Sequence, residues 1–114
     1  MASPATYNMV VPQATTFNFQ FQVKNGNTPW DLTNYTGTMT VRPFVGASTT
    51  TLVASTANGR MTLGSSGMVT VTVDATITGA ISPGRYSYDL VLNSSGTVTR
   101  LLEGKFTVTG AVTL

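Results

Sequence analysis

Residues 16–24 read Thr-Phe-Asn-Phe-Gln-Phe-Gln-Val-Lys, and this stretch decides the fold class. Its apolar side chains, Phe17, Phe19, Phe21 and Val23, alternate strictly with polar ones. A period of two places all four on one face of a β-strand, whereas a helix would scatter them around its axis. The stretch therefore predicts a strand with one buried face.

The same alternation recurs along the chain, in residues 38–43, 68–74 and 85–92, with turn residues such as Asn58-Gly59 between the segments. The composition is dominated by Val and Thr, which favour a pleated surface, and only 9% of the residues are charged. About seven to eight short strands with turns between them predict an all-β protein, an antiparallel β-sandwich. The inner faces are expected to carry Phe17, Phe19, Phe21, Met39, Val41, Val69, Val71, Val73, Tyr86, Tyr88, Leu90 and Phe106.

The penultimate strand begins with an arrangement typical of one kind of sandwich. Residues 83–88 read Pro-Gly-Arg-Tyr-Ser-Tyr, so that Tyr86 lies two residues before the core position of Tyr88. This order matches the tyrosine corner of immunoglobulin domains, where the second position is Cys. We therefore expect an immunoglobulin-like sandwich forming a single domain over residues 1–114. Because Pro12 cannot donate to a strand ladder, the alternating stretch Tyr7, Met9 and Val11 that ends there is expected to be an edge strand or an arm. Extended arms are expected over about 1–12 and about 109–114.

The last strand, residues 97–108, breaks its own alternation. Leu101 interrupts the apolar parity, and Arg100 falls on the apolar side. A β-bulge within residues 100–102 would restore the pattern. The alternative is that Leu101 faces a partner chain.

Two further segments are expected to close the ends of the sandwich. Trp30 and Leu32 lie in a short extended piece and can plug one end of the core. Residues 75–80 are expected to form a helical turn that places Ile77 and Ile81 beneath the sheets.

The composition removes most catalytic chemistry. The chain has no His and no Cys, which excludes His-dependent triads, thiol nucleophiles, zinc fingers and iron–sulfur sites. Its four acids, Asp31, Asp74, Asp89 and Glu103, are scattered, and Asp31 is well placed for an Asx turn. A hydrolase with an acid pair would need two of them to meet in the fold, and we rank that hypothesis last. No catalytic, cofactor-binding or metal-binding residue is predicted.

Charge and hydropathy narrow the choice of partners. The net charge is only +2, and the basic residues lie singly, without the clustered stripe of a nucleic-acid-binding protein. No apolar run approaches the roughly 20 residues of a membrane span, and residues 1–5 lack the basic and apolar parts of a signal peptide. We expect neither nucleic acid nor membrane as a partner, and synthesis in a cytoplasm.

Several turn-and-strand motifs resemble a known family. Residues 25–36 read Asn-Gly-Asn-Thr-Pro-Trp-Asp-Leu-Thr-Asn-Tyr-Thr and are followed by Met-Thr-Val-Arg-Pro at 39–43. Residues 58–63, 83–90 and 98–104 continue the likeness. Together they resemble the small immunoglobulin-like structural proteins of tailed bacteriophages, and 25–36 is similar to the N-terminal domain of phage baseplate upper proteins. The sequence departs from that pattern at Trp30, where the family often has a small aliphatic residue.

The resemblance implies a non-enzymatic structural protein of the virion, made in the cytoplasm of a bacterial host. It would be present in many copies and attached to the tail or baseplate through other virion proteins. One alternative is a head decoration (cement) protein on the capsid. Another is a carbohydrate-binding module for host recognition, in which Trp30, Tyr35 or Tyr7 would stack on a sugar.

The scarcity of charges also suggests how neighbouring chains are contacted. With only two Lys to blunt exposed strand edges, we expect strand addition, mainly at the two ends of the chain. The candidate contact residues are Tyr7, Met9, Val11, Trp30, Leu101, Val112 and Leu114.

Overall fold

A computed structural model describes residues 5–25, 27–64 and 66–110, and the regular secondary structure in them is nearly all β-strand. The elements in chain order are β1 (Ala5–Thr6), β2 (Met9–Pro12), β3 (Phe17–Gln22), β4 (Lys24–Asn25), β5 (Thr28–Pro29), β6 (Thr36–Arg42), β7 (Leu52–Ser55), β8 (Met61–Leu63), β9 (Met68–Val73), α1 (Ala75–Gly79), β10 (Gly84–Ser94) and β11 (Thr97–Thr109).

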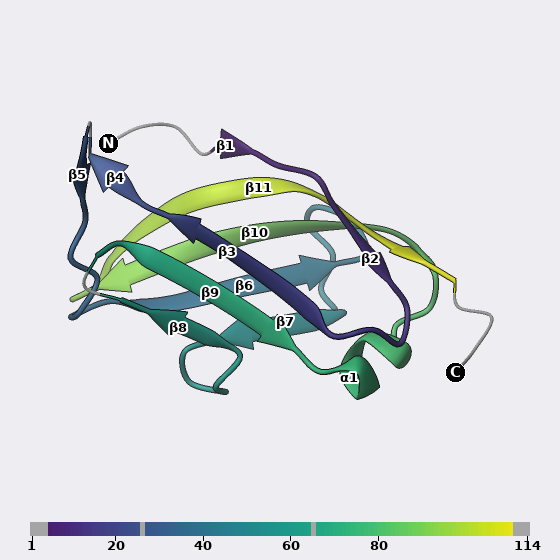
Figure 1. The fold of residues 1–114 in the computed structure, drawn as a ribbon. Helices are drawn as coiled ribbons and strands as arrows, with labels where there is room; N and C mark the ends of the chain where they lie inside the picture. Colours follow the sequence, from purple (N-terminus) through teal and green to yellow (C-terminus); the bar gives the residue numbers. More distant parts are fainter. Residues whose placement is uncertain (1–4, 26, 65, 111–114) are drawn as a thin grey trace.

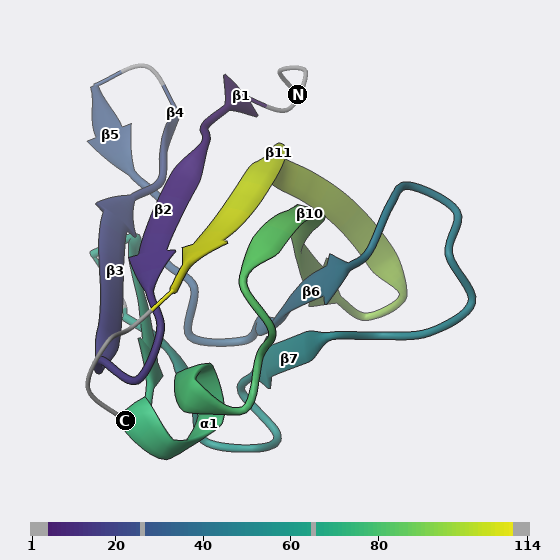
Figure 2. The ribbon, with the colours of Figure 1, turned by 90° about the vertical axis from the view of Figure 1, so that its right-hand side faces the viewer.

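Two sheets pack face to face (Figure 1). The larger has the order β1–β11–β10–β6–β7, with β2 also paired to β11, and the smaller has the order β3–β9–β8. The strands β4 and β5 form a separate two-stranded ribbon. Figure 2 shows the sheets edge-on, with α1 across one end of the space between them. This is the immunoglobulin-like β-sandwich that the sequence predicts.

The first strands depart from the expected antiparallel arrangement. Both β1 and β2 pair parallel with β11, with Ala5 opposite Leu102 and Met9 opposite Phe106. Residues 9–12 therefore form the edge strand that was one of the two expectations for this stretch, and the alternative of an extended arm is wrong for residues 5–12. The strands also differ in length, and the two longest are β10 with 11 residues and β11 with 13.

The tyrosine corner is present. The hydroxyl of Tyr86 donates a hydrogen bond to the carbonyl of Ser82, at 2.5 Å, across the turn before β10. Tyr88 is buried, and its hydroxyl donates to the carbonyl of Tyr7. The position that carries Cys in antibody domains thus ties β10 to the N-terminal strand.

The bulge in the last strand is confirmed. Leu90 lies opposite Leu102, and Val91 lies opposite Arg100, so that Leu101 is the extra residue. The insertion keeps Leu102 buried and leaves Leu101 half-buried against the core. The break in alternation was a sign of a local irregularity, as the sequence suggested.

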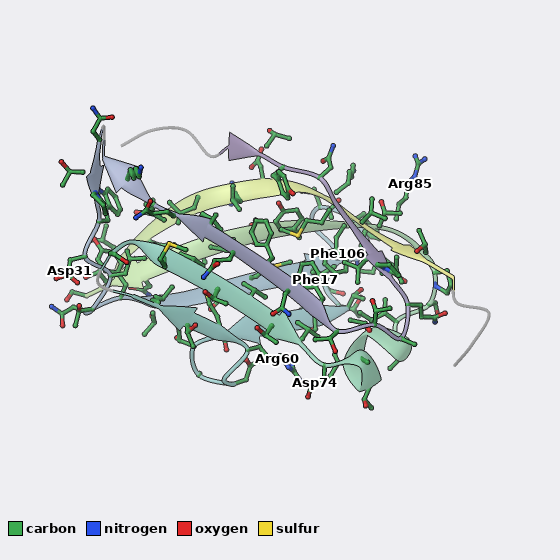
Figure 3. The ribbon with its side chains drawn as sticks, in the orientation of Figure 1. Phe17, Asp31, Arg60, Asp74, Arg85 and Phe106 are labelled. Carbon is green, nitrogen blue, oxygen red and sulfur yellow. The ribbon has the colours of Figure 1, made fainter. Side chains whose placement is uncertain are left out.

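The core is centred on the larger sheet rather than on β3. Phe106 is fully buried, and the ring of Phe17 meets it edge-on at a centroid distance of 5.7 Å (Figure 3). The side chains of Phe17, Phe19 and Phe21 are only half-buried, although the sequence predicts a buried face, because β3 is an edge strand. Tyr86 is half-buried as well. The other predicted core residues are buried: Met39, Val41, Val69, Val71, Val73, Tyr88, Leu90 and Phe106.

The ends of the sandwich close largely as expected. Leu32 and Ile81 are buried, whereas Trp30 and Ile77 are half-buried against the core. The helical turn exists as α1, and the hydroxyl of the buried Thr78 anchors it by donating to the carbonyl of Thr15 at 2.6 Å.

Candidate functional site

Two of the predicted contact residues are not available to a partner. Met9 and Val11 are 4% and 1% exposed, because the parallel pairing of β2 with β11 turns them into the core. Their neighbour Val10 points outward instead and is 66% exposed. The alternation in residues 7–11 was detected in the sequence, but its apolar face packs inside this chain, and both residues are withdrawn as contact candidates.

The other candidates are distributed over the molecule. Tyr7 is half-exposed, and its ring lies tilted on Phe19 at a centroid distance of 5.3 Å. Trp30 stacks on Tyr35 at 6.3 Å and is half-buried. Leu101 is the half-buried bulge residue, while Val112 and Leu114 lie outside the described residues.

The outer edge of β3 is the first candidate site. Among the described strands β3 pairs only with β9, and Phe21 lies opposite Val69. Two residues further on, the backbone N–H of Val23 donates to the carbonyl of Gly67 at 2.7 Å. Because the backbone alternates in direction, Phe17, Phe19 and Phe21 direct their N–H and C=O groups toward β9. The backbone groups of Asn18, Gln20 and Gln22 therefore point to the open edge.

A row of aromatic rings follows this open edge on its inner side. Phe17 and Phe19 stack at 6.4 Å, and Phe19 and Phe21 lie 5.4 Å apart. Beside the row, β2 and β3 enclose a hollow of about 280 Å³ that is lined by residues 7–12 and 15–19. Unpaired backbone and half-exposed aromatic area thus lie together, a combination typical of a site for strand addition.

The outer face of the larger sheet is the second candidate site, and it gathers five of the ten charged residues of the chain: Arg42, Asp89, Arg100, Glu103 and Lys105. They line a hollow of about 510 Å³. The Arg100 guanidinium lies 3.3 Å from the Asp89 carboxylate and 3.9 Å from that of Glu103. All three side chains remain 39–54% exposed, so these ion pairs orient the groups more than they stabilise the fold.

Pairing across β10 and β11 brings two of the four acids together. Asp89 lies directly opposite Glu103. The Arg100 guanidinium lies beside both carboxylates and forms an ion pair with each. This arrangement therefore resembles a salt-bridge network more than an acid–base pair.

The remaining acids, Asp31 and Asp74, lie well apart from each other (Figure 3). Asp31 forms the predicted Asx turn: its carboxylate accepts the Thr33 hydroxyl and, at 3.0 Å, the Thr33 backbone N–H. Both hydrogen bonds lower the pKa of Asp31 below its usual value, and the bond from the hydroxyl has the larger effect.

An apolar loop tip at the rim of the second site was missed in the sequence. Phe44 and Val45 are 62% and 85% exposed, in the loop between β6 and β7 that projects from the sandwich in Figure 2. The base of the loop is held by Arg42, whose guanidinium donates to the carbonyl of Ala47 at 3.0 Å. The sequence signal that could have revealed this loop tip is the apolar pair Phe44-Val45, which lies between Pro43 and Gly46 beside a polar stretch.

The described residues contain no group of three or more His, Cys, Asp or Glu side chains that could hold a metal ion. Nor, in residues 5–25, 27–64 and 66–110, is any helix long and apolar enough to cross a membrane.

Comparison with known proteins bears on the fold of the chain and not on its function. No family model and no curated protein sequence matches the chain. The chain is similar in structure to part of an endo-beta-1,4-mannanase from Thermotoga petrophila, with a TM-score of 0.52 and 15% identity. That match covers 91% of this chain but only 18% of the mannanase. Murine CRIg also aligns, over 95% of this chain and 93% of its own, with a TM-score of 0.42 and 11% identity.

Proposed function

We propose that the chain is a non-enzymatic structural protein of a bacteriophage virion, held on the tail or baseplate by contacts with other virion proteins. The open edge of β3 is the observation that supports an assembly role. It combines unpaired backbone groups with half-buried phenylalanines, in a chain that has few charged residues to blunt such an edge. The resemblance of residues 25–43 to phage proteins supports the kind of assembly. Location on the head, as a decoration protein, is the variant of this proposal.

The test is the protein composition of purified particles. Particles banded on a density gradient are expected to carry the chain at a fixed ratio to the major capsid protein, and immunogold labelling of it distinguishes tail from head. A chain found in the lysate but not in banded particles would contradict the proposal.

Attachment through backbone and apolar contacts predicts a weak dependence on salt. Few ion pairs are available for screening, because only 9% of the residues are charged. Washing particles in molar salt is therefore expected to leave the occupancy unchanged, as measured by quantitative mass spectrometry. Release at moderate ionic strength would instead indicate attachment through the charged face of Arg42, Asp89, Arg100, Glu103 and Lys105.

A second candidate function is carbohydrate binding for host recognition. The hollow of about 510 Å³ supports it, because the carboxylates of Asp89 and Glu103 and the guanidinium of Arg100 can hydrogen-bond to sugar hydroxyls. The exposed ring of Phe44 at the rim offers a face for stacking. The rings first considered, Trp30 and Tyr35, instead stack on each other.

A glycan array tests this second function. Binding that is lost in Asp89→Ala and kept in Asp74→Ala would support it, since Asp74 is exposed and does not line the hollow. Absence of any bound glycan would contradict it and leave the structural role untouched.

A further inference from the structure

The two main sheets have four edges among the described strands, and three of these carry features that hinder pairing. On β7 the outward carbonyl of Val53 accepts from the Asn58 amide at 2.9 Å and from the Arg60 guanidinium at 3.0 Å. The Ser55 N–H of the same strand donates to the Asn58 side chain at 3.0 Å. Side chains therefore occupy two of the outward backbone groups of β7, as a neighbouring strand would.

The edges of β2 and β8 are limited in other ways. Pro12 in β2 has no N–H to offer, and its carbonyl accepts from the hydroxyl of Thr15 at 2.6 Å. The strand β8 is only three residues long. Short strands and prolines are common means of preventing edge-to-edge pairing.

The edge of β3 has none of these features. Phe17–Gln22 is six residues long and contains no proline and no charged side chain. We propose that β3 is the self-association edge of this protein, pairing antiparallel with β3 of a second copy. The two three-stranded sheets would become one six-stranded sheet across a two-fold axis. This inference goes beyond the proposed function: it uses the same open edge of β3, but its occupant is a second copy of this chain rather than another virion protein.

The backbone geometry selects the register of that pair. The outward groups belong to Asn18, Gln20 and Gln22, so even-numbered residues must oppose even-numbered residues. All three are used when Gln20 opposes Gln20 of the second copy and Asn18 opposes Gln22 of the second copy. The next positively charged residue, Lys24, then lies opposite Thr16 of the second copy, so no like charges meet.

Both faces of the pair are self-complementary in this register. On the outer face, the Gln20 amide already donates to Thr70 at 3.1 Å, and the Asn18 side chain accepts from Thr72 at 2.8 Å. Each side-chain amide retains further donors and acceptors, so the row of hydrogen-bonded side chains can continue across the two-fold axis. On the inner face, Phe19 comes opposite Phe21 of the second copy, and pairs of aromatic side chains stabilise neighbouring strands.

The symmetry and the size of the contact set its strength. A two-fold pair uses the same edge on both copies, so association stops at a dimer instead of growing into a fibre. One six-residue edge is small beside the roughly 1,200–2,000 Å² buried in stable complexes, so the free dimer is weak. Copies held close together on one assembly would pair far more readily than free ones.

A charge exchange at the two-fold axis tests the proposal. In Gln20→Glu and in Gln20→Lys two like charges oppose each other across the dimer, whereas an equimolar mixture brings Glu opposite Lys. For the unaltered chain, we expect sedimentation equilibrium to show an average mass that rises with protein concentration. The mass should increase from 12.0 kDa toward twice that value as the concentration approaches millimolar. The mixture is expected to associate about five-fold or more tightly than either variant alone.

Matched controls separate pairing from general charge effects. Thr62→Glu and Thr62→Lys change an exposed residue of β8, at the opposite edge of the same sheet, and are expected to associate like the unaltered chain. Gln20→Pro removes the outward N–H and is expected to abolish association. Gln20→Val loses the same amide bond to Thr70 but keeps the N–H, and is expected to retain association.

Three results would overturn the proposal. The first is an unaltered chain that stays monomeric at every concentration, which would point to a strand from a different protein. The second is a Glu–Lys mixture no tighter than its components. The third is a mixture of Thr62→Glu and Thr62→Lys that associates more tightly than its components, as the mixture of Gln20→Glu and Gln20→Lys is expected to do. Circular dichroism of each variant establishes that it is folded, so loss of association is not confused with loss of the fold.

Discussion

Gly67 shows how a single residue joins two parts of the chain. Its φ is +83°, and a Cβ there would lie 2.3 Å from the carbonyl oxygen of Val23 and 3.1 Å from that of Trp30. We predict that Gly67→Ala lowers the free energy of unfolding by about 3 kcal/mol or more, from strain and overlap together. The control is Gly59→Ala, where φ is +80° and the space is open, and where strain alone should cost about 1–2 kcal/mol. Urea unfolding measures both, and equal losses would contradict the role of the close approach.

Tyr88 gives the molecule a predictable response to high pH. Burial raises its pKa to about 12, with a smaller contribution from Tyr7, whereas the same group in the unfolded chain titrates near pH 10. Between pH 10 and pH 12 the unfolded state therefore loses the proton first, and the free energy of unfolding falls as the pH rises. The loss is up to about 2–3 kcal/mol and is absent below pH 10. Tyr88→Phe should remove this component from a series of unfolding curves, and an unchanged slope would contradict the assignment.

At the scale of elements, β1 is a structural part of the sheet rather than a detachable arm. Removing residues 1–7 deletes β1 together with the carbonyl of Tyr7 that accepts the buried hydroxyl of Tyr88. We predict that this deletion lowers the free energy of unfolding by about 2 kcal/mol or more, because a buried hydroxyl is left without its partner and a strand pairing is lost.

A double-mutant cycle isolates the hydroxyl in that prediction. Tyr88→Phe should cost about 1 kcal/mol in the full chain but nothing, or even a gain, in the chain that lacks residues 1–7. Equal costs in the two backgrounds would show that the hydroxyl does not depend on β1.

Elements that depend on local pattern were predictable, and those that depend on distant pairing were not. The bulge at Leu101 and the tyrosine corner at Tyr86 were inferred because each leaves a signal within a few residues. The parallel pairing of residues 5–12 with β11 left no such signal, since almost a hundred residues separate Ala5 from Leu102. The meeting of Asp89 with Glu103 depends in the same way on the register of two long strands.

For the whole molecule, the position of the core decides which aromatic side chains matter most. Phe106 is fully buried, whereas Phe19 is half-buried on an edge strand. We predict that Phe106→Ala lowers the free energy of unfolding by about 3–5 kcal/mol and Phe19→Ala by about 1–2 kcal/mol. Chemical denaturation of the two variants checks the ranking. A larger loss for Phe19→Ala would mean that the smaller sheet contains the main core.

The whole-molecule view also shows why the candidate sites were harder to predict than the fold class. Alternation assigns Phe17, Phe19 and Phe21 to one face, but it does not say whether a strand lies at the centre or the edge of a sheet. The open edge of β3 and the gathering of charges around Arg100 both appear only once the strand order is known.

The dependence of the core on the last strand has a consequence for synthesis in the cell. The phenylalanines of β3 are synthesised well before Phe106 and the strand that pairs with β2. Adding residues 23–109 at about 5–20 per second takes roughly 4–17 s. Throughout that interval the aromatic face of β3 lacks Phe106, on which the ring of Phe17 packs in the folded chain. Expression at low temperature or with a holding chaperone is therefore expected to raise the yield of folded protein.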